Sequence, residues 1–430
     1  MTKVTYVPKP RYENPMAERL GLGADDLKRE SKLARLLEDL QGKIRTPIQG
    51  VVEWRYAEAE ETGALPLPKG WNQWPILTSR SVWGTTQKHT WLVAEITIPE
   101  EARGETFAIN VTSHWRTQQG STDPQCLAYL NGRIVQAIDG NHTELVISCE
   151  AVPGEKHLVQ VNAFTFDERP MVGFQTDMVL RDDRIEGLYH DLETAFEVAI
   201  QLSQTDSRRH AVLDRIERAL YALDRREGNV EALKTSLPDA EKIAGEIHEL
   251  AGDEMQPVVS AFGHTHLDVA WLWRIKHVRD KTARSFATAL NLMEEFPKFV
   301  FMYNQSVLFN FLKQDYPELW DRVKQKVRDG QFEVDGAMWV EPDVNISSGE
   351  ALVRQIMHGQ QFHMEEFGIS PKCVWLPDTF GYSAALPQIL EKSGIEFFVT
   401  SKLSWNDTDR HPYDSFFWRG IDGSKVKSLL

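Results

Sequence analysis

Two histidines and an aspartate alternate in one short segment that has the residue types of a metal site. His264, His266 and Asp268 occupy every second position, so in extended backbone their side chains lie on one face. Imidazole and carboxylate groups suit a divalent metal of the zinc type. Trp271 follows and offers an apolar surface on which a sugar ring can stack. The segment predicts a metal site beside a carbohydrate surface; the alternative is a histidine pair that only packs near a strand end.

The three polar residues of this segment are expected to differ in role. His266 and Asp268 lie close together on the shared face, and we expect them to be the first metal ligands. His264 lies nearer the preceding apolar run. We therefore expect it to orient a ligand or a substrate hydroxyl rather than to bind the metal.

Three further motifs place polar side chains where strands are expected to end. Asp378 in WLPDTFGYS is predicted to be catalytic, a metal ligand or both, although an aspartate there can also cap a helix. Asp343 in WVEPDVN is a candidate for substrate binding or for a turn and cap. Lys402 and Trp405 in SKLSWN combine a cation with an aromatic ring, as polyol recognition requires; the alternative is a solvated loop.

Composition narrows the class of protein. A chain of 430 residues suffices for two or three domains. A formal charge of -15 argues against nucleic acid or an anionic membrane as the main partner. Three scattered cysteines make neither a disulfide framework nor a cysteine metal cluster. No segment resembles a signal peptide or a membrane span, so a cytoplasmic location is expected. A homo-oligomer is compatible with the sequence, which does not decide the oligomeric state.

The pattern along the chain predicts four segments in an α/β plus all-β protein. Residues 1–50 form a helical lead-in with an amphipathic pattern. Residues 51–185 alternate like short strands, with a hairpin signal at Asn131-Gly132, and predict a β-sandwich of jelly-roll kind. Residues 186–255 predict a helical linker. Residues 256–430 predict the catalytic β/α-barrel domain.

This last segment alternates strands with helices, which predicts a parallel sheet. The candidate site residues follow successive strands, where barrels and open α/β sheets place their active sites. Because five or six strands do not close a typical barrel, the barrel is expected to be incomplete, truncated at the C-terminus of a chain that is the N-terminal portion of something longer. The expected strands are Val258–Phe262, Phe299–Tyr303, Gln331–Met338, Cys373–Leu376 and Phe397–Thr400.

Four motifs in this order resemble glycoside hydrolase family 38, the α-mannosidases, in its cytosolic and bacterial branch. They are HTHLDVAWLWR, WVEPDVNISSGEALVRQ, WLPDTFGYSAALPQIL and TSKLSWND, and the resemblance covers roughly 256–420. It implies a retaining enzyme that hydrolyses terminal α-mannosyl residues of glycans, including oligomannose glycans. It implies Zn²⁺ as the metal, with Co²⁺ or Ca²⁺ as alternatives.

The resemblance also carries over residue by residue. His266 and Asp268 match the first two metal ligands of the family. Asp378 matches the aspartate that is both nucleophile and metal ligand, and Trp271 matches the aromatic residue under the bound mannose. The family's last metal-binding histidine and its acid/base carboxylate belong to motifs that this sequence does not contain.

Two alternative functions remain open at this stage. A metal-dependent carbohydrate deacetylase would use the same ligands, with Asp378 as a base rather than a nucleophile. An inactive truncated fragment would only bind glycan or mediate assembly through its sandwich.

Overall fold

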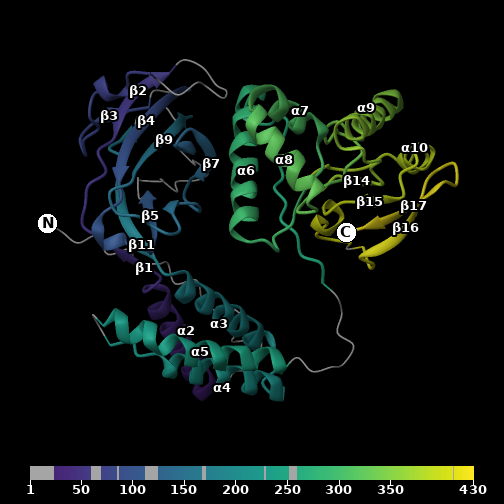
Figure 1. Ribbon diagram of the computed structural model, residues 1–430. Coiled ribbons are helices and arrows are strands. Elements are labelled where there is room, and N and C mark those ends of the chain that lie inside the picture. Colours follow the sequence, from purple (N-terminus) through teal and green to yellow (C-terminus); the bar gives the residue numbers. More distant parts are fainter. Residues whose placement is uncertain are drawn as a thin grey trace.

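The computed structural model contains a β-rich unit, a helical unit and an α/β unit (Figure 1). The predicted combination of mixed α/β structure with antiparallel sheets is confirmed. Among the described residues, no helix has the length and apolarity needed to cross a membrane. The structure describes residues 24–59, 69–84, 87–111, 124–166, 171–226, 229–250, 259–409 and 411–430.

The β-rich unit consists of two antiparallel sheets that share one hydrophobic core. Leu92 and Val161 from one sheet and Phe107 from the other are fully buried in this core. One sheet has the order β2-β4-β9-β6-β7: Arg55–Ala59, Lys88–Thr97, Lys156–Thr165, Gln125–Leu130 and Arg133–Ile138. The other has the order β1-β11-β5-β8: Arg45–Pro47, Thr176–Arg181, Thr106–Val111 and Glu144–Ser148. A separate pair joins β3 (Val82–Trp83) to β10 (Met171–Val172).

The predicted hairpin at Asn131-Gly132 is confirmed and joins β6 to β7. Both turn residues have positive φ, 51° at Asn131 and 85° at Gly132. Asparagine and glycine tolerate this backbone, and such a turn matches the twist of the two strands. The Asn131 side chain also accepts a hydrogen bond from the Leu158 backbone N–H at 2.8 Å, which ties the turn to β9.

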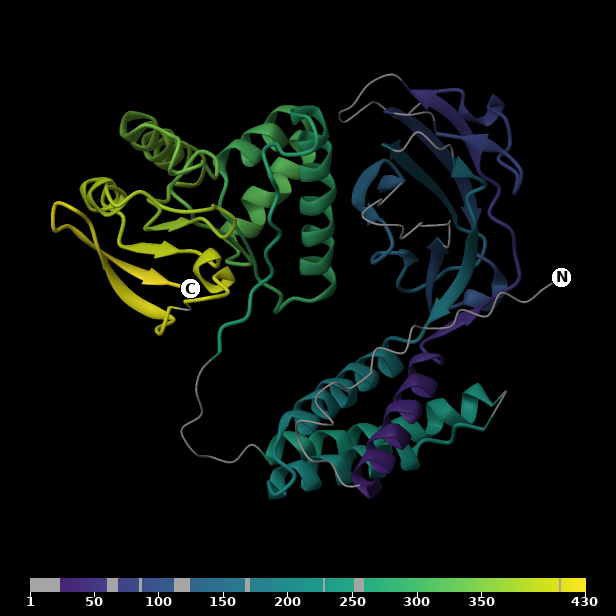
Figure 2. The ribbon, with the colours of Figure 1, turned by 180° about the vertical axis from the view of Figure 1, so that it is seen from behind.

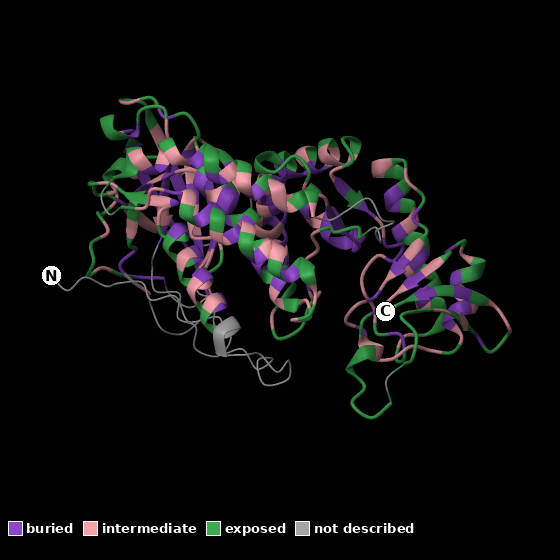
Figure 3. Cartoon of the chain, turned by 90° about the horizontal axis from the view of Figure 1, so that it is seen from below, coloured by how far each residue is buried: buried purple, intermediate pink, exposed green. Residues whose placement is uncertain are grey.

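The helical unit joins segments from distant parts of the sequence. Leu33 of α2 is buried in the same core as Leu192, Ile216 and Leu237 of the other helices. The lead-in and linker helices therefore pack together, below the sandwich in Figure 1. Figure 3 shows buried positions recurring along these helices between exposed ones, as amphipathic helices require. The helices are α2 (Ala24–Gln41), α3 (Asp183–Gln201), α4 (Ser207–Ala222) and α5 (Val230–Glu249).

The α/β unit has short parallel strands in two sheets. β12 pairs with β13, and β14, β15 and β17 pair in parallel, with β16 antiparallel at the edge. These strands do not close into a barrel within the part of the chain that the structure describes. The strands are Phe301–Tyr303, Phe332–Val334, Cys373–Trp375, Phe397–Val399, Ser415–Arg419 and Lys425–Leu429 for β12 to β17. The helices are α6 (Ile275–Glu295), α7 (Ser306–Asp315), α8 (Pro317–Arg328), α9 (Gly349–Phe367) and α10 (Leu386–Lys392).

The first expected strand of this unit, Val258–Phe262, is wrong for the residues that the structure describes. Residue 258 lies outside them, and residues 259–262 have no strand structure. Only Gly263 pairs in parallel with β12: its N–H donates to the Val300 carbonyl, and its carbonyl accepts from the Met302 N–H, both at 2.8 Å. Val259 and Phe262 are exposed, so no packed layer favours the extended pairing that their apolar character predicts.

The sandwich packs against α6 of the α/β unit, and Figures 1 and 2 show the two side by side. Strand β4 is buried from His89 to Ala94 without a break, as expected for a strand covered on both faces. Leu92 faces the sandwich core. Trp91 instead shares a core with Phe286 of α6.

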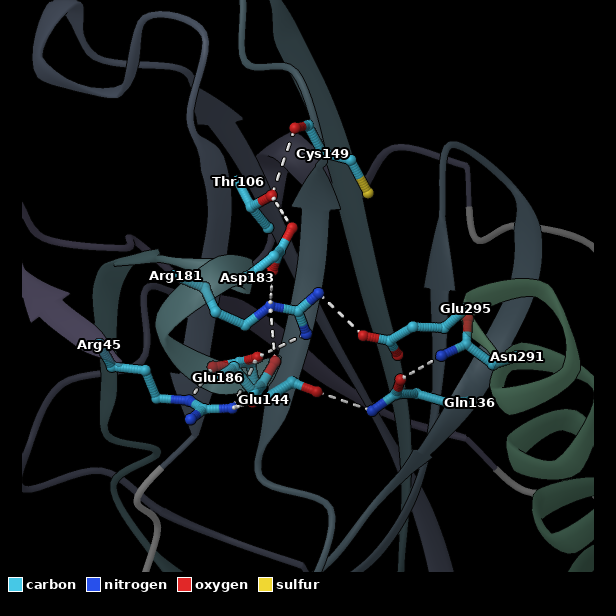
Figure 4. Close-up of polar contacts among 10 residues, drawn as sticks. All are labelled: Arg45, Thr106, Gln136, Glu144, Cys149, Arg181, Asp183, Glu186, Asn291 and Glu295. Carbon is cyan, nitrogen blue, oxygen red and sulfur yellow. Dashed lines mark hydrogen bonds and ion pairs between the residues drawn. The ribbon is translucent and has the colours of Figure 1, made fainter. Parts of the chain in front are cut away.

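Arg181 joins all three units at the end of β11 (Figure 4). Its guanidinium pairs with Asp183 of α3 at 2.7 Å, Glu144 of β8 at 3.2 Å and Glu295 of α6 at 2.8 Å. Burial lowers the pKa of Arg181, but the surrounding carboxylates outweigh that effect and raise it. A single buried cation therefore connects the sandwich with both other units.

Candidate metal centre

Two loops of the α/β unit bring His266, Asp268 and Asp378 together. One ligand atom from each lies within 4.8 Å of the other two. The Nε2 atom of His266 is 3.3 Å from Asp268 Oδ1 and 3.3 Å from Asp378 Oδ2. All three side chains are partly exposed at the loop surface. The sequence predicted this group of three from two motifs that are more than a hundred residues apart.

Buried neighbours hold the two loops in place. Leu267, between the two ligands of the first loop, is 1% exposed. Its carbonyl accepts a hydrogen bond from the buried Gln305 side chain at 2.8 Å. Leu376, which directly follows β14 and lies two residues before Asp378, is fully buried. Anchoring these leucines turns the polar residues beside them toward the open edge of the strands.

The donor set fits a divalent cation. One imidazole nitrogen and two carboxylate oxygens from separate loops suit a zinc-type ion, and three protein ligands leave coordination positions for other groups. The Glu341 carboxylate, opposed by burial and aided by Asp268, raises the pKa of His266 to about 9.

Lys402 lies against Asp378, the third candidate ligand. Its Nζ forms an ion pair with Asp378 Oδ1, and its side chain is only 7% exposed. The ammonium also lies 3.2 Å from the ring centre of Trp405 and 4.4 Å from that of Phe380. Aromatic faces attract a cation in this geometry. The amine predicted to contact substrate is thus held between a carboxylate and two rings.

Exposed aromatic rings occur in the same loops as the ligands. Trp271, Phe380 and Trp405 are each about two-thirds exposed, at 67%, 70% and 69%. Trp271 also makes an edge contact with Trp273 at 5.5 Å. The sequence predicted Trp271 and Trp405 as sugar-contacting residues, whereas Phe380 stood only inside the WLPDTFGYS motif. Its position two residues after Asp378 was the signal for it.

His264 does not belong to the group of three. Its Nε2 lies 3.3 Å from Asn304 Oδ1, and its ring stacks on Tyr303 at 5.7 Å. Burial lowers the pKa of His264, although the Asn304 contact opposes that shift. These contacts join His264 to Asn304 and Tyr303 rather than to the group of three.

Asp343 is exposed and also stands outside the group of three. Its Oδ1 accepts hydrogen bonds from the backbone N–H groups of Asn345 at 2.9 Å and Ile346 at 2.8 Å. This is the turn role that the sequence left open for it. Substrate binding by Asp343 stays a prediction.

Glu341, two residues before Asp343, is the acid of this motif that reaches the ligands. Its side chain is 8% exposed, and Oε2 lies 3.4 Å from His266 Nδ1. From this motif the sequence analysis selected Asp343 and not Glu341. The position of Glu341 closer to the strand end was the available signal.

The sequence that forms this site is similar to sequences of known proteins. Residues 256–430 match the glycosyl hydrolases family 38 N-terminal domain. Alpha-mannosidase 2C1 of Homo sapiens is 42% identical over 236 residues, covering 55% of this chain and 22% of its own. Alpha-mannosidase G of Dictyostelium discoideum is 47% identical over 173 residues, covering 40% of this chain and 16% of its own. The chain thus spans about a fifth of the length of these relatives.

An alpha-mannosidase from Saccharomyces cerevisiae is 41% identical over 184 residues, with 43% of this chain and 17% of its own covered. Among solved structures, an alpha-mannosidase from Enterococcus faecalis aligns with a TM-score of 0.34 and 22% identity, covering 39% of this chain and 19% of that one. The ordered motifs, the group of three candidate ligands and the matched range lie in the same part of the chain. Residues 256–430 are a glycosyl hydrolase family 38 N-terminal domain.

Proposed function

We propose that this chain carries the metal-binding and nucleophilic residues of a retaining α-mannosidase that acts on terminal α-mannosyl residues. The observation that supports this most is the convergence of His266, Asp268 and Asp378 within 4.8 Å of one another, inside a family 38 domain. The relatives named above are alpha-mannosidases. As a further part of the proposal, the parallel strands belong to a β/α barrel.

The proposed metal is Zn²⁺, with Co²⁺ or Ca²⁺ as alternatives, held by His266, Asp268 and Asp378. A divalent ion there supplies Lewis-acid binding of the sugar hydroxyls. The protein's part is to orient the ring, because mannose has an axial 2-hydroxyl that obstructs attack at the anomeric carbon. The exposed rings of Trp271, Phe380 and Trp405 provide apolar faces for the sugar.

Asp378 is the proposed nucleophile. A carboxylate oxygen forms a bond to the anomeric carbon while the bond to the leaving oxygen breaks, and that oxygen takes a proton from the family's acid/base carboxylate, whose motif this sequence does not contain. Water then gives one proton back to that carboxylate as it attacks the anomeric carbon, and the bond to Asp378 breaks to restore its carboxylate. Lys402 pairs with Oδ1 and thereby fixes the rotation of the carboxylate. We assign Lys402 to this task rather than to direct binding of sugar.

The test is to trap the glycosyl-enzyme with a 2- or 5-fluoro mannosyl fluoride and to find the modified peptide by mass spectrometry. Fluoride departs without a strong proton donor, so the test does not require the family's acid/base motif. We expect the sugar on Asp378. A label on Glu341 or Asp343 with Asp378 unmodified contradicts the assignment. Deacetylation of an acetylated sugar without any trapped intermediate favours Asp378 as a base.

A further inference from the structure

The Glu341 carboxylate lies against the side of His266 that faces away from the other two ligands. His266 Nε2 points to Asp268 and Asp378, whereas Nδ1 lies 3.4 Å from Glu341 Oε2. Both Nδ1 and Oε2 are buried, and neither has a well-formed hydrogen bond to another group in the part of the chain that the structure describes. The two atoms face each other and are near the distance at which such a bond forms.

Glu341 is held in this position from two directions. Its other oxygen, Oε1, accepts a hydrogen bond from the Asn304 side chain at 2.9 Å. Asn304 is 3% exposed and also donates to the Trp375 carbonyl at 3.0 Å. The Glu341 backbone N–H donates to Gln305 Oε1 at 3.1 Å, and Gln305 in turn holds the Leu267 carbonyl. The loops that carry Glu341 and His266 are therefore linked through one buried glutamine.

The chemistry of the carboxylate and the imidazole decides which ring nitrogen of a neutral His266 carries the hydrogen and which one keeps its lone pair for a metal. An ionised carboxylate only accepts hydrogen bonds, so the hydrogen of a neutral His266 is favoured on Nδ1. The lone pair is then on Nε2, which faces Asp268 and Asp378. A carboxylate on the far nitrogen of a ligating histidine fixes its tautomer and orientation and increases its basicity as a ligand.

We propose that Glu341 is a positioning residue that holds His266 with its Nε2 lone pair directed at the metal. This inference rests on the proposed metal centre and adds a residue that the four motifs did not single out for it. Asp343 cannot take this role, because its carboxylate binds two backbone N–H groups of its own loop. Glu341 sets the affinity of the site without touching the sugar.

The test measures zinc affinity of the full 430-residue chain by competition with a chromophoric chelator. Glu341→Gln is expected to weaken zinc binding by about 10- to 100-fold, the usual effect of removing a partner that orients a ligating histidine. Glu333→Gln is the matched control, because Glu333 is an exposed acid on the preceding strand β13 and the substitution changes the charge equally. It should bind zinc like the unmodified chain.

Two more variants separate the explanations. Glu341→Asp keeps the charge but shortens the side chain. If Glu341 acts by positioning His266, this variant should clearly lose zinc affinity. Full zinc affinity would mean that only the charge matters and would overturn the proposal. Wild-type affinity in Glu341→Gln, with its metal-free unfolding midpoint preserved, would also overturn it. The His266→Ala variant gives the zinc affinity of a chain that lacks the proposed metal site. If the unmodified chain binds zinc no better than His266→Ala, the metal centre itself is refuted, and the role of Glu341 with it.

Discussion

At the scale of single residues, the proposed role of Asp378 involves its ion pair with Lys402. The ammonium pairs with Asp378 Oδ1 between the rings of Trp405 and Phe380. A hydrogen bond to a charged group contributes about 1.5–3 kcal/mol. Lys402→Met keeps most of the stem and removes the charge, so we predict that labelling of Asp378 by the fluorosugar slows about ten- to hundredfold.

The control for this change is Lys392→Met, at the exposed end of α10. It should leave the labelling rate unchanged. Equal rates for Lys402→Met and the unmodified chain, measured at saturating fluorosugar, would show that the ion pair does not assist attack.

The two aspartates predicted as site residues should respond differently to removal. Asp378→Ala takes away a proposed metal ligand, so zinc affinity should fall by more than the roughly 10- to 100-fold typical of a supporting residue. Asp343→Ala should leave zinc affinity unchanged and lower the free energy of unfolding by about 1 kcal/mol, because two turn hydrogen bonds are lost. Zinc titration and thermal unfolding of both variants check this. A similar loss of zinc affinity in both would contradict it.

At the scale of elements, α6 supports the strands that carry the ligand loops. Phe286 on its inner face is fully buried and contacts the rings of Phe301, Tyr303 and Phe332 on β12 and β13. Phe286→Ala should lower the free energy of unfolding by about 3–5 kcal/mol through the cavity that it leaves. Denaturant unfolding measures this.

Phe417→Ala on β16 provides the comparison, because this side chain is 67% exposed. It should change the stability by no more than about 0.5 kcal/mol. Equal effects of the two substitutions would mean that α6 does not support the strands.

The sequence predicts features that depend on local patterns better than features that depend on contacts between distant parts of the chain. Local patterns placed the strands around β12 to β15 correctly, because each pattern is contained in one element. The failed strand at 258–262 and the shared core of α2 with α3 depend on contacts across the chain, which no local pattern encodes. The choice between Glu341 and Asp343 likewise depends on side-chain direction, which the sequence alone does not fix.

At the scale of the whole molecule, the buried Arg181 side chain links the three units through ion pairs with Asp183, Glu144 and Glu295. Removing one partner of a buried pair leaves uncompensated charge and typically costs about 3–5 kcal/mol. Arg181→Met should therefore lower the free energy of unfolding by roughly 3 kcal/mol. Arg184→Met removes an exposed pair with Glu241 and should cost no more than about 1 kcal/mol. Denaturant unfolding compares the two variants. Equal losses of unfolding free energy would show that the ion pairs of Arg181 stabilise the molecule no more than an exposed pair does.

We further propose that the sandwich and the α/β unit unfold together, because Trp91 of β4 and Phe286 of α6 share one core. If so, the boundaries predicted at residues 51–185, 186–255 and 256–430 do not separate independently stable units.

The central claim is that His266, Asp268 and Asp378 form one metal centre. Its most direct test is an anomalous difference map, recorded at the zinc absorption edge, from crystals of the 430-residue chain soaked in Zn²⁺. We predict a peak about 2.0–2.2 Å from His266 Nε2 and from a carboxylate oxygen of each aspartate. A map without a peak among these three atoms, or with its strongest peak elsewhere on the chain, would contradict the claim.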